Sequence, residues 1–429
     1  MTHQLPLRKR TKEPAQARNE RRHAMSRLDR DEIVQTAATL FAARGYTTVS
    51  VADIIDQLGC TPPRLYRRFP SKLALLHAVL AAAITRQECT GCDLDKYIAA
   101  ALKAAVDSPD LVIVYARDRR WISPIEFGDV ARRATDHDTG WRTAIIAVAP
   151  SLTPFAVMIR HQAISAIIAA SAVAPRVAGG ARLRAAFTVG MHNMITAPYT
   201  TVDSAPSLAR RWHVRPTRRQ EILDAAITLF GERGYEDVRV DDVGKAVGIA
   251  GPSVFQHFTT KQQILVAAFD RGITQLMIAA STALDSSNNA EDALQRLVSG
   301  LAETAARNRN LLSVLVREAG GLDEPDRERI GRLRRDYDDI WAAVISQIWE
   351  ELNADTAQAI ARAGSEAVLS GLGFADYPSA AVDLATSTLT FITSTASTFE
   401  NSLQRRVPTT APIQTRPILD VVELNQKKS

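Results

Sequence analysis

The sequence contains the same segment twice. The stretch from Ile33 to Leu76 aligns without a gap with the stretch from Ile222 to Leu265, at a constant offset of 189 residues. Across the wider ranges 30–84 and 219–273, 20 of the 55 paired positions are identical. Repeated segments of this length adopt one fold, so a prediction for the first copy holds for the second. The rest of the 429-residue chain has to be arranged around two copies of one unit.

The similarity resumes after each copy at an offset of 200 residues. Matched pairs include Leu111/Leu311, Val114/Val314, Arg117/Arg317, Arg132/Arg332, Asp138/Asp338, Trp141/Trp341 and Ile145/Ile345. The difference of 200 − 189 = 11 residues predicts an insertion in the second copy, in or near Asp285–Ala290. The duplication therefore covers two whole subunits.

Composition favours helices and permits a polyanionic partner. Alanine is abundant, and the chain carries a net charge of +5 with a pI near 9.2. Basic residues gather just before each copy: residues 1–30 hold nine Lys/Arg against three Asp/Glu, and residues 210–219 hold five Arg and no acid. These runs are expected either to contact DNA or to form solvated surface.

The sequence predicts a soluble cytoplasmic protein with no membrane partner. No apolar stretch follows the N-terminal basic run before Arg30, as a signal peptide would require. The longest apolar region, 144–178, is interrupted by prolines and charged residues, which argues against a membrane span. Three cysteines do not make a secreted disulfide framework.

Each copy predicts a helix-turn-helix unit braced by a longer helix. In the first copy the expected helices are Arg30–Arg44, Val51–Leu58, Pro62–Phe69 and Lys72–Glu88. Gly45 and Gly59 fit the turns between them, and Ser50, Thr61 and Ser71 fit helix N-caps. Two short helices joined by a tight turn are the arrangement that inserts the second helix into the major groove.

The second helix of each helix-turn-helix, called here the reading helix, is the one expected to enter the major groove. The exposed faces of the two reading helices are expected to differ. Apolar residues at helical spacing should face the core, namely Leu65 and Phe69 in copy one and Val254 and Phe258 in copy two. The side chains left facing outward are Arg64, Arg67 and Arg68 in copy one, and Ser253, Gln256 and His257 in copy two.

Two stretches carry a family resemblance. LFAARGYTTVSVADIIDQLGCTPPRLYRRFPSK and LFGERGYEDVRVDDVGKAVGIAGPSVFQHFTTK both resemble the DNA-binding domain of TetR-family regulators. The tandem layout and the segment GIAGPSVFQHFTTKQQIL are similar to the double TetR regulators of mycobacteria, of the type that represses a mammalian-cell-entry operon.

The resemblance implies an all-α fold of two tandem TetR-like units. Each unit would hold a helix-turn-helix domain and a helical ligand and dimerisation domain. TetR-family subunits pair through their last two helices, here 155–173 with 182–195 and 355–372 with 379–398. One chain is then expected to fold as a pseudo-dimer, with a homodimer of chains carrying four DNA-binding units as the alternative.

The predicted divisions follow from the repeat. They are a basic arm 1–28, a first DNA-binding domain 29–88, a first ligand domain 93–197, a linker 198–216, a second DNA-binding domain 217–273, a second ligand domain 274–405 and a tail 406–429.

Predicted DNA contacts divide into phosphate and base contacts. Lys72 and Lys261 begin helices whose free N–H groups also suit phosphate. Family resemblance adds Tyr66, whereas Phe255 stands at that position in copy two and lacks the hydroxyl. Arg64 and Arg67 suit guanine, while Gln256 suits adenine and Ser253 several bases. Because the base-contacting side chains of the two copies differ, we expect an asymmetric operator. The alternative is that Arg67 and Arg68 are only solvated surface residues.

Each ligand domain is expected to hold an apolar cavity for a lipid-like or acyl-CoA-like effector, as the resemblance implies. The candidate residues are Arg117, Trp121, Trp141, Arg317, Glu318, Trp341 and Trp349. A simpler interpretation assigns Trp341 and Trp349 to the core, and Arg317 with Glu318 to a structural ion pair.

Other chemistry is not expected. Cys89 and Cys92 have the spacing of half a zinc site but no further ligands nearby, and the acids Asp336, Asp338 and Asp339 lie beside arginines that would pair with them. No cofactor, metal or enzyme motif is present. The expected function is a DNA-binding transcriptional repressor released by a small hydrophobic effector. The alternative is an activator or architectural protein without an effector.

Overall fold

The computed structural model describes residues 30–89, 91–122, 124–173, 180–199, 216–372 and 378–404. Every regular element among these residues is a helix, which confirms the predicted all-α fold. The predicted arm 1–28, most of the linker 198–216 and the tail 406–429 lie outside the described residues.

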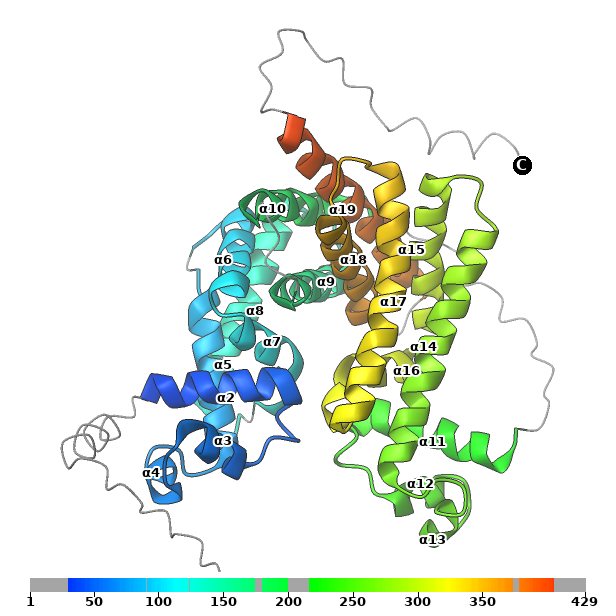
Figure 1. Ribbon diagram of the computed structural model, residues 1–429. Helices are drawn as coiled ribbons and strands as arrows, with labels where there is room; N and C mark the ends of the chain where they lie inside the picture. The colour runs from blue at the N-terminus through cyan, green and yellow to red at the C-terminus, as the bar shows by residue number, and fades with distance from the viewer. Residues whose placement is uncertain are drawn as a thin grey trace, which may run out of the picture.

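Half one comprises α2 to α10 and half two comprises α11 to α19. The elements of half one are α2 (Arg30–Arg44), α3 (Val51–Leu58), α4 (Pro62–Tyr66), α5 (Lys72–Gln87), α6 (Leu94–Asp107), α7 (Pro109–Asp118), the 3-10 turn η1 (Arg119–Trp121), α8 (Gly128–Val148), α9 (Pro154–Val173) and α10 (Gly180–Thr196). Those of half two are α11 (Arg218–Arg233), α12 (Val240–Ala246), α13 (Gly251–Val254), α14 (Lys261–Asp285), α15 (Ala290–Arg307), α16 (Arg309–Arg317), η2 (Ala319–Gly321), α17 (Glu324–Ile348), α18 (Ala354–Leu372) and α19 (Pro378–Gln404). Figure 1 shows the halves beside each other, with α2–α4 and α11–α13 at the same end of the molecule.

The last two helices of each half join the halves, as predicted. α9 packs against α18, and α10 packs against α19. The ring centroids of Phe187 and Phe391 lie 5.5 Å apart, and the Asn193 amide donates to the Ser394 hydroxyl at 3.0 Å. These contacts confirm the intrachain pseudo-dimer.

A buried ion pair crosses this interface. Arg160 on α9 is fully buried, and its guanidinium lies 2.5 Å from the carboxylate of Asp383 on α19, which is 1% exposed. Arg160 also donates to the carbonyls of Ile195 and Ala197 at the end of α10. A buried charge is tolerated only when such partners replace water. This one arginine therefore binds elements of both halves together.

The inserted residues of copy two lengthen helices. α5 contains 16 residues and α14 contains 25, so 25 − 16 = 9 additional residues continue the helix beyond the point where α5 ends. The insertion predicted in or near Asp285–Ala290 thus lies mostly in the last turns of α14, which ends at Asp285. In the connection between α5 and α6, Cys89 and Cys92 form a disulfide.

The third helix of the first copy ends earlier than predicted. α4 stops at Tyr66 instead of Phe69, and α5 stops at Gln87 instead of Glu88. The equivalent helix of half two is also short, since α13 ends at Val254. Arg67 and Arg68 consequently follow the helix in a turn.

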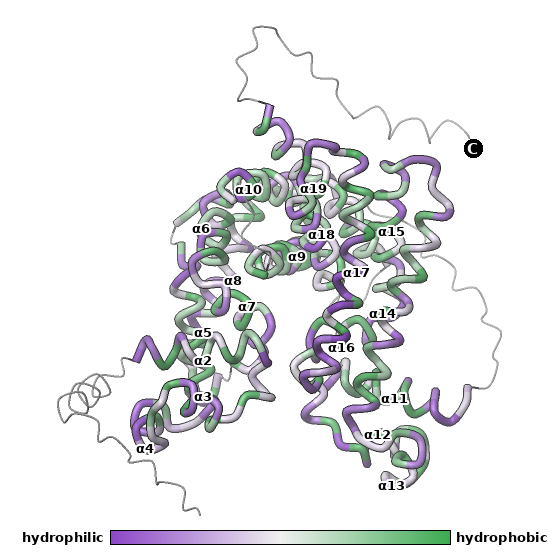
Figure 2. The backbone as a smooth tube through the Cα atoms, viewed as in Figure 1, coloured by the Kyte–Doolittle hydropathy of each residue, from purple (hydrophilic) through white to green (hydrophobic). Residues whose placement is uncertain are grey.

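Two helices are long and apolar enough to cross a membrane by length and composition alone, namely α9 and α14. α9 lies in the middle of the molecule against α18, where Figure 2 shows it largely apolar, whereas the region around α4 is largely hydrophilic. The apolar residues of α9 thus serve the interface between the halves.

Candidate nucleic-acid interface and effector cavity

The first helix-turn-helix, α2 to α4, is called here the first reading unit, and its helix α3 begins with a capping box. The Ser50 hydroxyl accepts a hydrogen bond from the Asp53 N–H at 3.1 Å, and the Asp53 carboxylate accepts one from the Ser50 N–H at 2.7 Å. These bonds hold the pKa of Asp53 below its usual value. Gly59 then takes a left-handed φ of 59°, which turns the chain from α3 towards α4.

α4 and the turn after it present basic and aromatic side chains to solvent. Leu65 and Phe69 are 2% and 3% exposed and anchor the segment in the core. Tyr66 is 47% exposed, Arg67 and Arg68 are exposed, and Arg64 is half-buried. All four side chains therefore lie on the outer end of half one.

The corresponding face of half two carries different chemistry. Val254 and Phe258 are fully buried, and Phe255 is 47% exposed. Gln256 is exposed, while Ser253 and His257 are half-buried. The face contains no arginine where the first unit has three, because the equivalent positions of copy two are Ser253, Gln256 and His257.

The two helix-initial lysines brace their own units. The Lys72 ammonium donates to the Thr47 carbonyl at 3.2 Å and lies 4.4 Å from the centroid of the Tyr46 ring. Lys261 repeats this geometry, with the Glu236 carbonyl at 3.3 Å and the Tyr235 ring at 4.1 Å. Burial lowers the pKa of both lysines. Each ammonium thus sits beside the turn that precedes α3 or α12.

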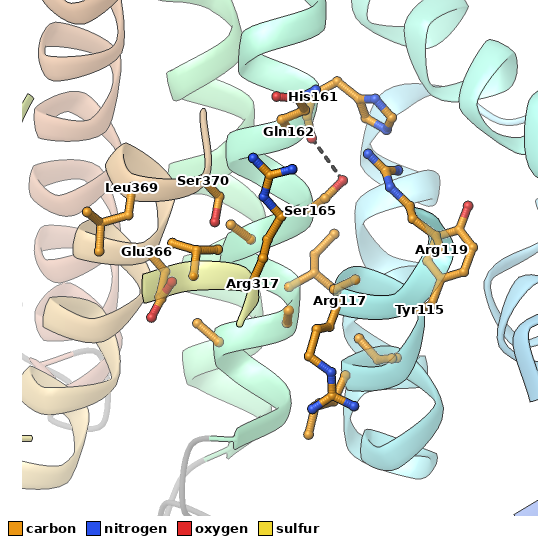
Figure 3. Close-up of a pocket in the computed structure, with 18 of the residues that line it drawn as sticks. Tyr115, Arg117, Arg119, His161, Gln162, Ser165, Arg317, Glu366, Leu369 and Ser370 are labelled. Atoms are coloured by element: carbon orange, nitrogen blue, oxygen red, sulfur yellow. Dashed lines mark hydrogen bonds between the residues drawn. The ribbon is translucent and has the colours of Figure 1, made fainter. Parts of the chain in front are cut away.

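A cavity of about 320 Å³ lies between the halves. Its wall is formed by α7, α8 and α9 of half one and by α16 and α18 of half two. Figure 3 shows the polar side chains that surround it, including Tyr115, Arg119 and His161 from half one and Glu366 and Ser370 from half two. The sequence predicted a cavity inside each ligand domain. This one lies mainly in the first ligand domain, and α16 and α18 of half two supply the rest of its wall.

Equivalent positions of the two halves face each other across the cavity. The offset of 200 residues continues through α9 and α18, where Leu152/Leu352, Ala163/Ala363 and Ser165/Ser365 are identical. Seven pairs at this offset line the wall: Ile113/Ser313, Ala116/Val316, Arg117/Arg317, Gln162/Arg362, Ala166/Glu366, Ala169/Leu369 and Ala170/Ser370. The cavity therefore lies where the two halves meet, and half one supplies most of its wall.

The structure brings together only some of the predicted ligand residues. Arg117, Trp141 and Arg317 lie on the cavity wall. The other four candidates do not. Trp341 and Trp349 are 0% and 8% exposed in the core, as the simpler interpretation had it, because their helical spacing directs them inward.

Trp121 and Glu318 have other neighbours. The Trp121 ring lies 5.8 Å from that of Tyr46 and packs against the first helix-turn-helix unit. Glu318 is 6% exposed and accepts a hydrogen bond from Arg120 at 2.8 Å. The ion pair of Glu318 is therefore made with Arg120 in the other half.

Sequence reasoning missed several polar residues of the wall, namely His137, His161, Gln162, Arg119 and Arg362. A signal was available, because His161 and Gln162 interrupt the longest apolar stretch of the chain. Burial lowers the pKa of His161 to about 4 and also lowers that of His137, so both rings are neutral at pH 7.

The acidic residues on α17 are partnered by other side chains. Arg334 lies 3.3 Å from the Asp338 carboxylate, and Gln358 donates to Asp339 at 2.7 Å. Within the part of the chain that the structure describes, no three His, Cys, Asp or Glu residues are grouped to hold a metal.

The sequence matches two family models. The model described as "Bacterial regulatory proteins, tetR family" matches twice, at residues 33–79 and 222–268. The model described as "Tetracyclin repressor-like, C-terminal domain" matches residues 287–367. Both describe regulatory proteins, which confirms the prediction that the chain is not an enzyme.

Curated relatives share short segments with this chain. The HTH-type transcriptional activator FasR of Mycolicibacterium smegmatis is 29% identical over 84 residues, which is 20% of this chain and 38% of that protein. The biofilm operon icaADBC HTH-type negative transcriptional regulator IcaR of Staphylococcus aureus is 44% identical over 46 residues, 11% of this chain and 25% of that protein. The chain thus spans less than two-fifths of either relative.

Solved structures are similar to about one half of the chain. The TetR-family regulator PfmR of Thermus thermophilus has a TM-score of 0.35 at 24% identity, covering 41% of this chain and 96% of that one. A TetR-family regulator from Bordetella parapertussis has a TM-score of 0.38 at 17% identity, covering 40% of this chain and 93% of that one.

Proposed function

We propose that this chain regulates transcription by binding one asymmetric operator with two helix-turn-helix units that carry different side chains. Both units match the model of the tetR family of bacterial regulatory proteins. The observation that carries the proposal is the difference between the two exposed faces. One presents Arg64, Arg67 and Arg68, and the other presents Ser253, Gln256 and His257.

Base recognition follows from the chemistry of these faces. A guanidinium pairs with guanine O6 and N7, and a carboxamide pairs with adenine N6 and N7. Half one would therefore select a guanine-containing half-site, and half two an adenine-containing one. In a homodimer the two faces are identical and the operator is palindromic. Here the covalent pseudo-dimer removes that requirement.

Phosphate contacts would come from the starts of α5 and α14, where Lys72 and Lys261 lie beside free helix N–H groups. Tyr66 adds a hydroxyl that its equivalent Phe255 lacks. The two units would then sit about one helical turn apart, about 34 Å.

The regulator is proposed to act in the cytoplasm as a repressor that a small hydrophobic effector releases. The cavity between the halves supports an effector, because its wall combines apolar side chains with polar and charged groups that could orient a ligand. The tandem arrangement supports the mammalian-cell-entry operon repressor type. An activator or architectural role without an effector is the alternative, and one relative carries the name of an activator.

Footprinting of the full chain on its operator tests the unequal readers. Replacing both Arg64 and Arg67 with Gln should weaken binding by about 1–3 kcal/mol for each lost bidentate contact. Gln256→Ala should weaken contact with the other half-site only. Arg335→Gln, an exposed position on α17, serves as the control.

Two results would overturn the proposal. One is protection of a perfect inverted repeat by the unmodified chain. The other is loss of contact at the same half-site in both sets of variants. Light scattering with operator present reports whether one chain or two chains bind, because the pseudo-dimer already supplies both reading units.

A further inference from the structure

A disulfide lies between the helix that follows the first reading unit and the first helix of the adjoining ligand domain. Cys89 and Cys92 are bonded, with their Cα atoms 5.7 Å apart, in the connection between α5 and α6. Figure 1 shows α5 running from the reading unit towards α6. Disulfides are rare in the reducing cytoplasm, and those that form there are usually transient and redox-sensing. The proposed cytoplasmic regulator therefore carries a bond that its surroundings can open.

α5 and the first reading unit share one apolar core. Leu76 and Ile84 of α5 belong to the same buried cluster as Phe41 and Leu65 of the reading unit. Protein cores are close-packed, so they transmit displacements from one element to the next. A shift of α5 therefore moves the reading unit with it.

The disulfide marks the boundary between two cores of half one. Cys89 and Cys92 are half-buried and pack against the large core that the ligand domains of both halves share. Ile84, five residues before Cys89, belongs to the core of the first reading unit instead. The disulfide-bonded loop thus joins the body that carries the DNA-reading side chains to the ligand domains.

Half two crosses the same boundary with a continuous helix. α14 contributes Ile273 to the core of the second helix-turn-helix, α11 to α13, and Leu276 to the shared core. At the offset of 189 residues, the cysteine positions of half one are occupied by Ile278 and Ser281 within α14. Half two cannot form this bond, so a redox effect on the connection is confined to half one.

The remaining restraints on the connection are polar contacts at the surface. The Arg133 guanidinium of α8 donates to the Glu88 carboxylate at 2.6 Å, and Asp93 accepts from the Lys96 N–H at 2.9 Å. The partly exposed pair of Arg133 and Glu88 is a weak restraint. Glu88, Gly91 and Asp93 are exposed, and a Cβ added at Gly91 would have no neighbour within 4 Å. A small dithiol can therefore approach the half-buried sulfurs from this side.

We propose that Cys89 and Cys92 form a reversible dithiol–disulfide switch that controls how firmly the first reading unit is held against the ligand domains. The bond restrains the junction of α5 and α6, and its reduction leaves only noncovalent contacts there. Ordering a mobile unit on DNA costs free energy, so the disulfide form should bind the operator more tightly. This inference rests on the proposed regulator function and gives that regulator a redox signal.

The exchange needs a dithiol reductant, such as one of the thioredoxin class. Its thiolate attacks one sulfur of the pair, the bond between Cys89 and Cys92 breaks, and a mixed disulfide forms. The second thiol of the reductant then displaces the protein sulfur. Both cysteines end as thiols, having gained two electrons and two protons, and the reductant ends as a disulfide. Oxidised glutathione, a disulfide oxidant, drives the reverse reaction.

Operator binding by the full chain in both redox forms tests the switch. Cys60→Ser removes the one cysteine outside the pair. In this background, thiol titration should count two thiols after dithiothreitol and none after oxidised glutathione, with an intact mass that shows no bound glutathione. Reduction should weaken operator binding at least threefold by fluorescence anisotropy, and footprinting should lose protection only at the half-site of the first reading unit.

Two further measurements separate the switch from other effects of the reagents. The double variant Cys89→Ser, Cys92→Ser should bind the operator like the reduced chain and respond to neither reagent. Hydrogen exchange should be faster after reduction for amides in residues 86–97, whereas amides in residues 275–286 of α14 should exchange equally in both forms.

Equal or tighter operator binding after reduction would overturn the inference. It would also be overturned by failure of the bond to form with oxidised glutathione, by a response in the double serine variant, or by equal loss of protection at both half-sites. If both redox forms bind the operator equally, only this inference fails. If neither form binds it, the proposed regulator function fails, and equal hydrogen exchange in the two forms would then reject the switch as well.

Discussion

Arg117 and Arg317 occupy equivalent positions in the two halves but make different contacts. The Arg117 guanidinium donates to the carbonyls at the end of α2 and to Asp118. Arg317 donates to the Ser313 hydroxyl, and Figure 3 shows the two guanidinium groups pointing in opposite directions. Both arginines line the cavity, but only Arg117 also supports a helix-turn-helix unit through its bonds to the end of α2.

The 3-10 turns that follow Arg117 and Arg317 also differ between the halves, because η1 carries long side chains where η2 carries glycines. In η1, Trp121 packs on Tyr46 and Arg120 reaches across to Glu318. In η2, the equivalent residues of Trp121 and Arg120 are Gly321 and Gly320. The Thr48 hydroxyl donates to the Gly320 carbonyl, so the first reading unit rests on half two through this turn.

This difference shows what covalent duplication permits. In a homodimer each substitution occurs on both sides of the axis, so a long side chain and the space it needs cannot evolve separately. In this chain half one supplies long side chains that extend to half two. Half two supplies glycines at the equivalent positions and a buried carboxylate that pairs with one of these side chains. Three substitutions that make the halves alike, or remove a difference between them, test this comparison.

The largest effect is expected at the buried ion pair of the interface. Copy two has Ile360 at the position equivalent to Arg160. Arg160→Ile would leave the Asp383 carboxylate buried without its partner, which costs about 3–5 kcal/mol. Urea denaturation should show this loss in the free energy of unfolding.

The double variant Arg160→Ile, Asp383→Leu is the matched control, because it removes both charges. It should recover most of the lost stability. A single variant that loses less than about 1 kcal/mol, the range of exposed pairs, would mean that this ion pair does not hold the halves together.

An intermediate effect is expected where the first reading unit rests on half two. A Cβ at Gly45 would lie 2.9 Å from the Cα of Gly320, so the two backbones touch. Gly320→Arg introduces the side chain that half one has at this position and should displace the turn around Gly45. Operator affinity should fall about tenfold, or about 1.4 kcal/mol, because the spacing of the units changes.

Gly300→Ala is the control for this substitution, since the nearest atom to its added Cβ is 4.0 Å away. The distribution of distances between spin labels on α3 and α12 should broaden in Gly320→Arg. In Gly300→Ala it should stay as in the unmodified chain. An unchanged distance together with unchanged operator affinity would show that the contact does not set the spacing.

The sequence was sufficient for those features that depend on local pattern or on the repeat. Helical periodicity and glycine positions predicted α2 and α3 with their observed bounds. The duplication, together with the resemblance to TetR-family regulators, implied the pairing of α9 with α18. These features need no knowledge of how side chains pack across the halves.

The cavity could not be predicted in the same way. It depends on which residues of α7, α8 and α9 lie beside those of α16 and α18, and this is set by the packing of helices that are far apart in the sequence. Trp341 and Trp349 were predicted as ligand-binding residues but lie in the core, for a related reason. Trp341 has the same helical spacing whether it faces a ligand or the core, and only its neighbours decide.

The smallest effect concerns the start of the helix before each reading helix. Ser50 caps α3 through its hydroxyl, whereas Arg239 stands at the start of α12 and gives no side-chain cap. Ser50→Ala should lower stability by about 1 kcal/mol at pH 7. Arg239→Ala removes no hydroxyl cap and should change stability by less.

The cost of Ser50→Ala should also depend on pH. The Ser50 N–H, which alanine keeps, contributes most to the lowered pKa of Asp53 in the folded chain, and the Ser50 hydroxyl, which alanine lacks, donates to the same carboxylate at 2.8 Å and lowers the pKa further. A carboxyl with a depressed folded pKa adds stability above its unfolded pKa, which is about 3.9 for Asp, and loses it as the pH falls through the folded value. The difference in the free energy of unfolding between Ser50→Ala and the unmodified chain should therefore become smaller as the pH is lowered below about 4, and the part that remains comes from the bond between the Asp53 N–H and the hydroxyl. A difference that stays constant from pH 7 to pH 3 would assign the stabilisation to the neutral hydroxyl bond alone and leave the Asp53 charge without a role in the cap.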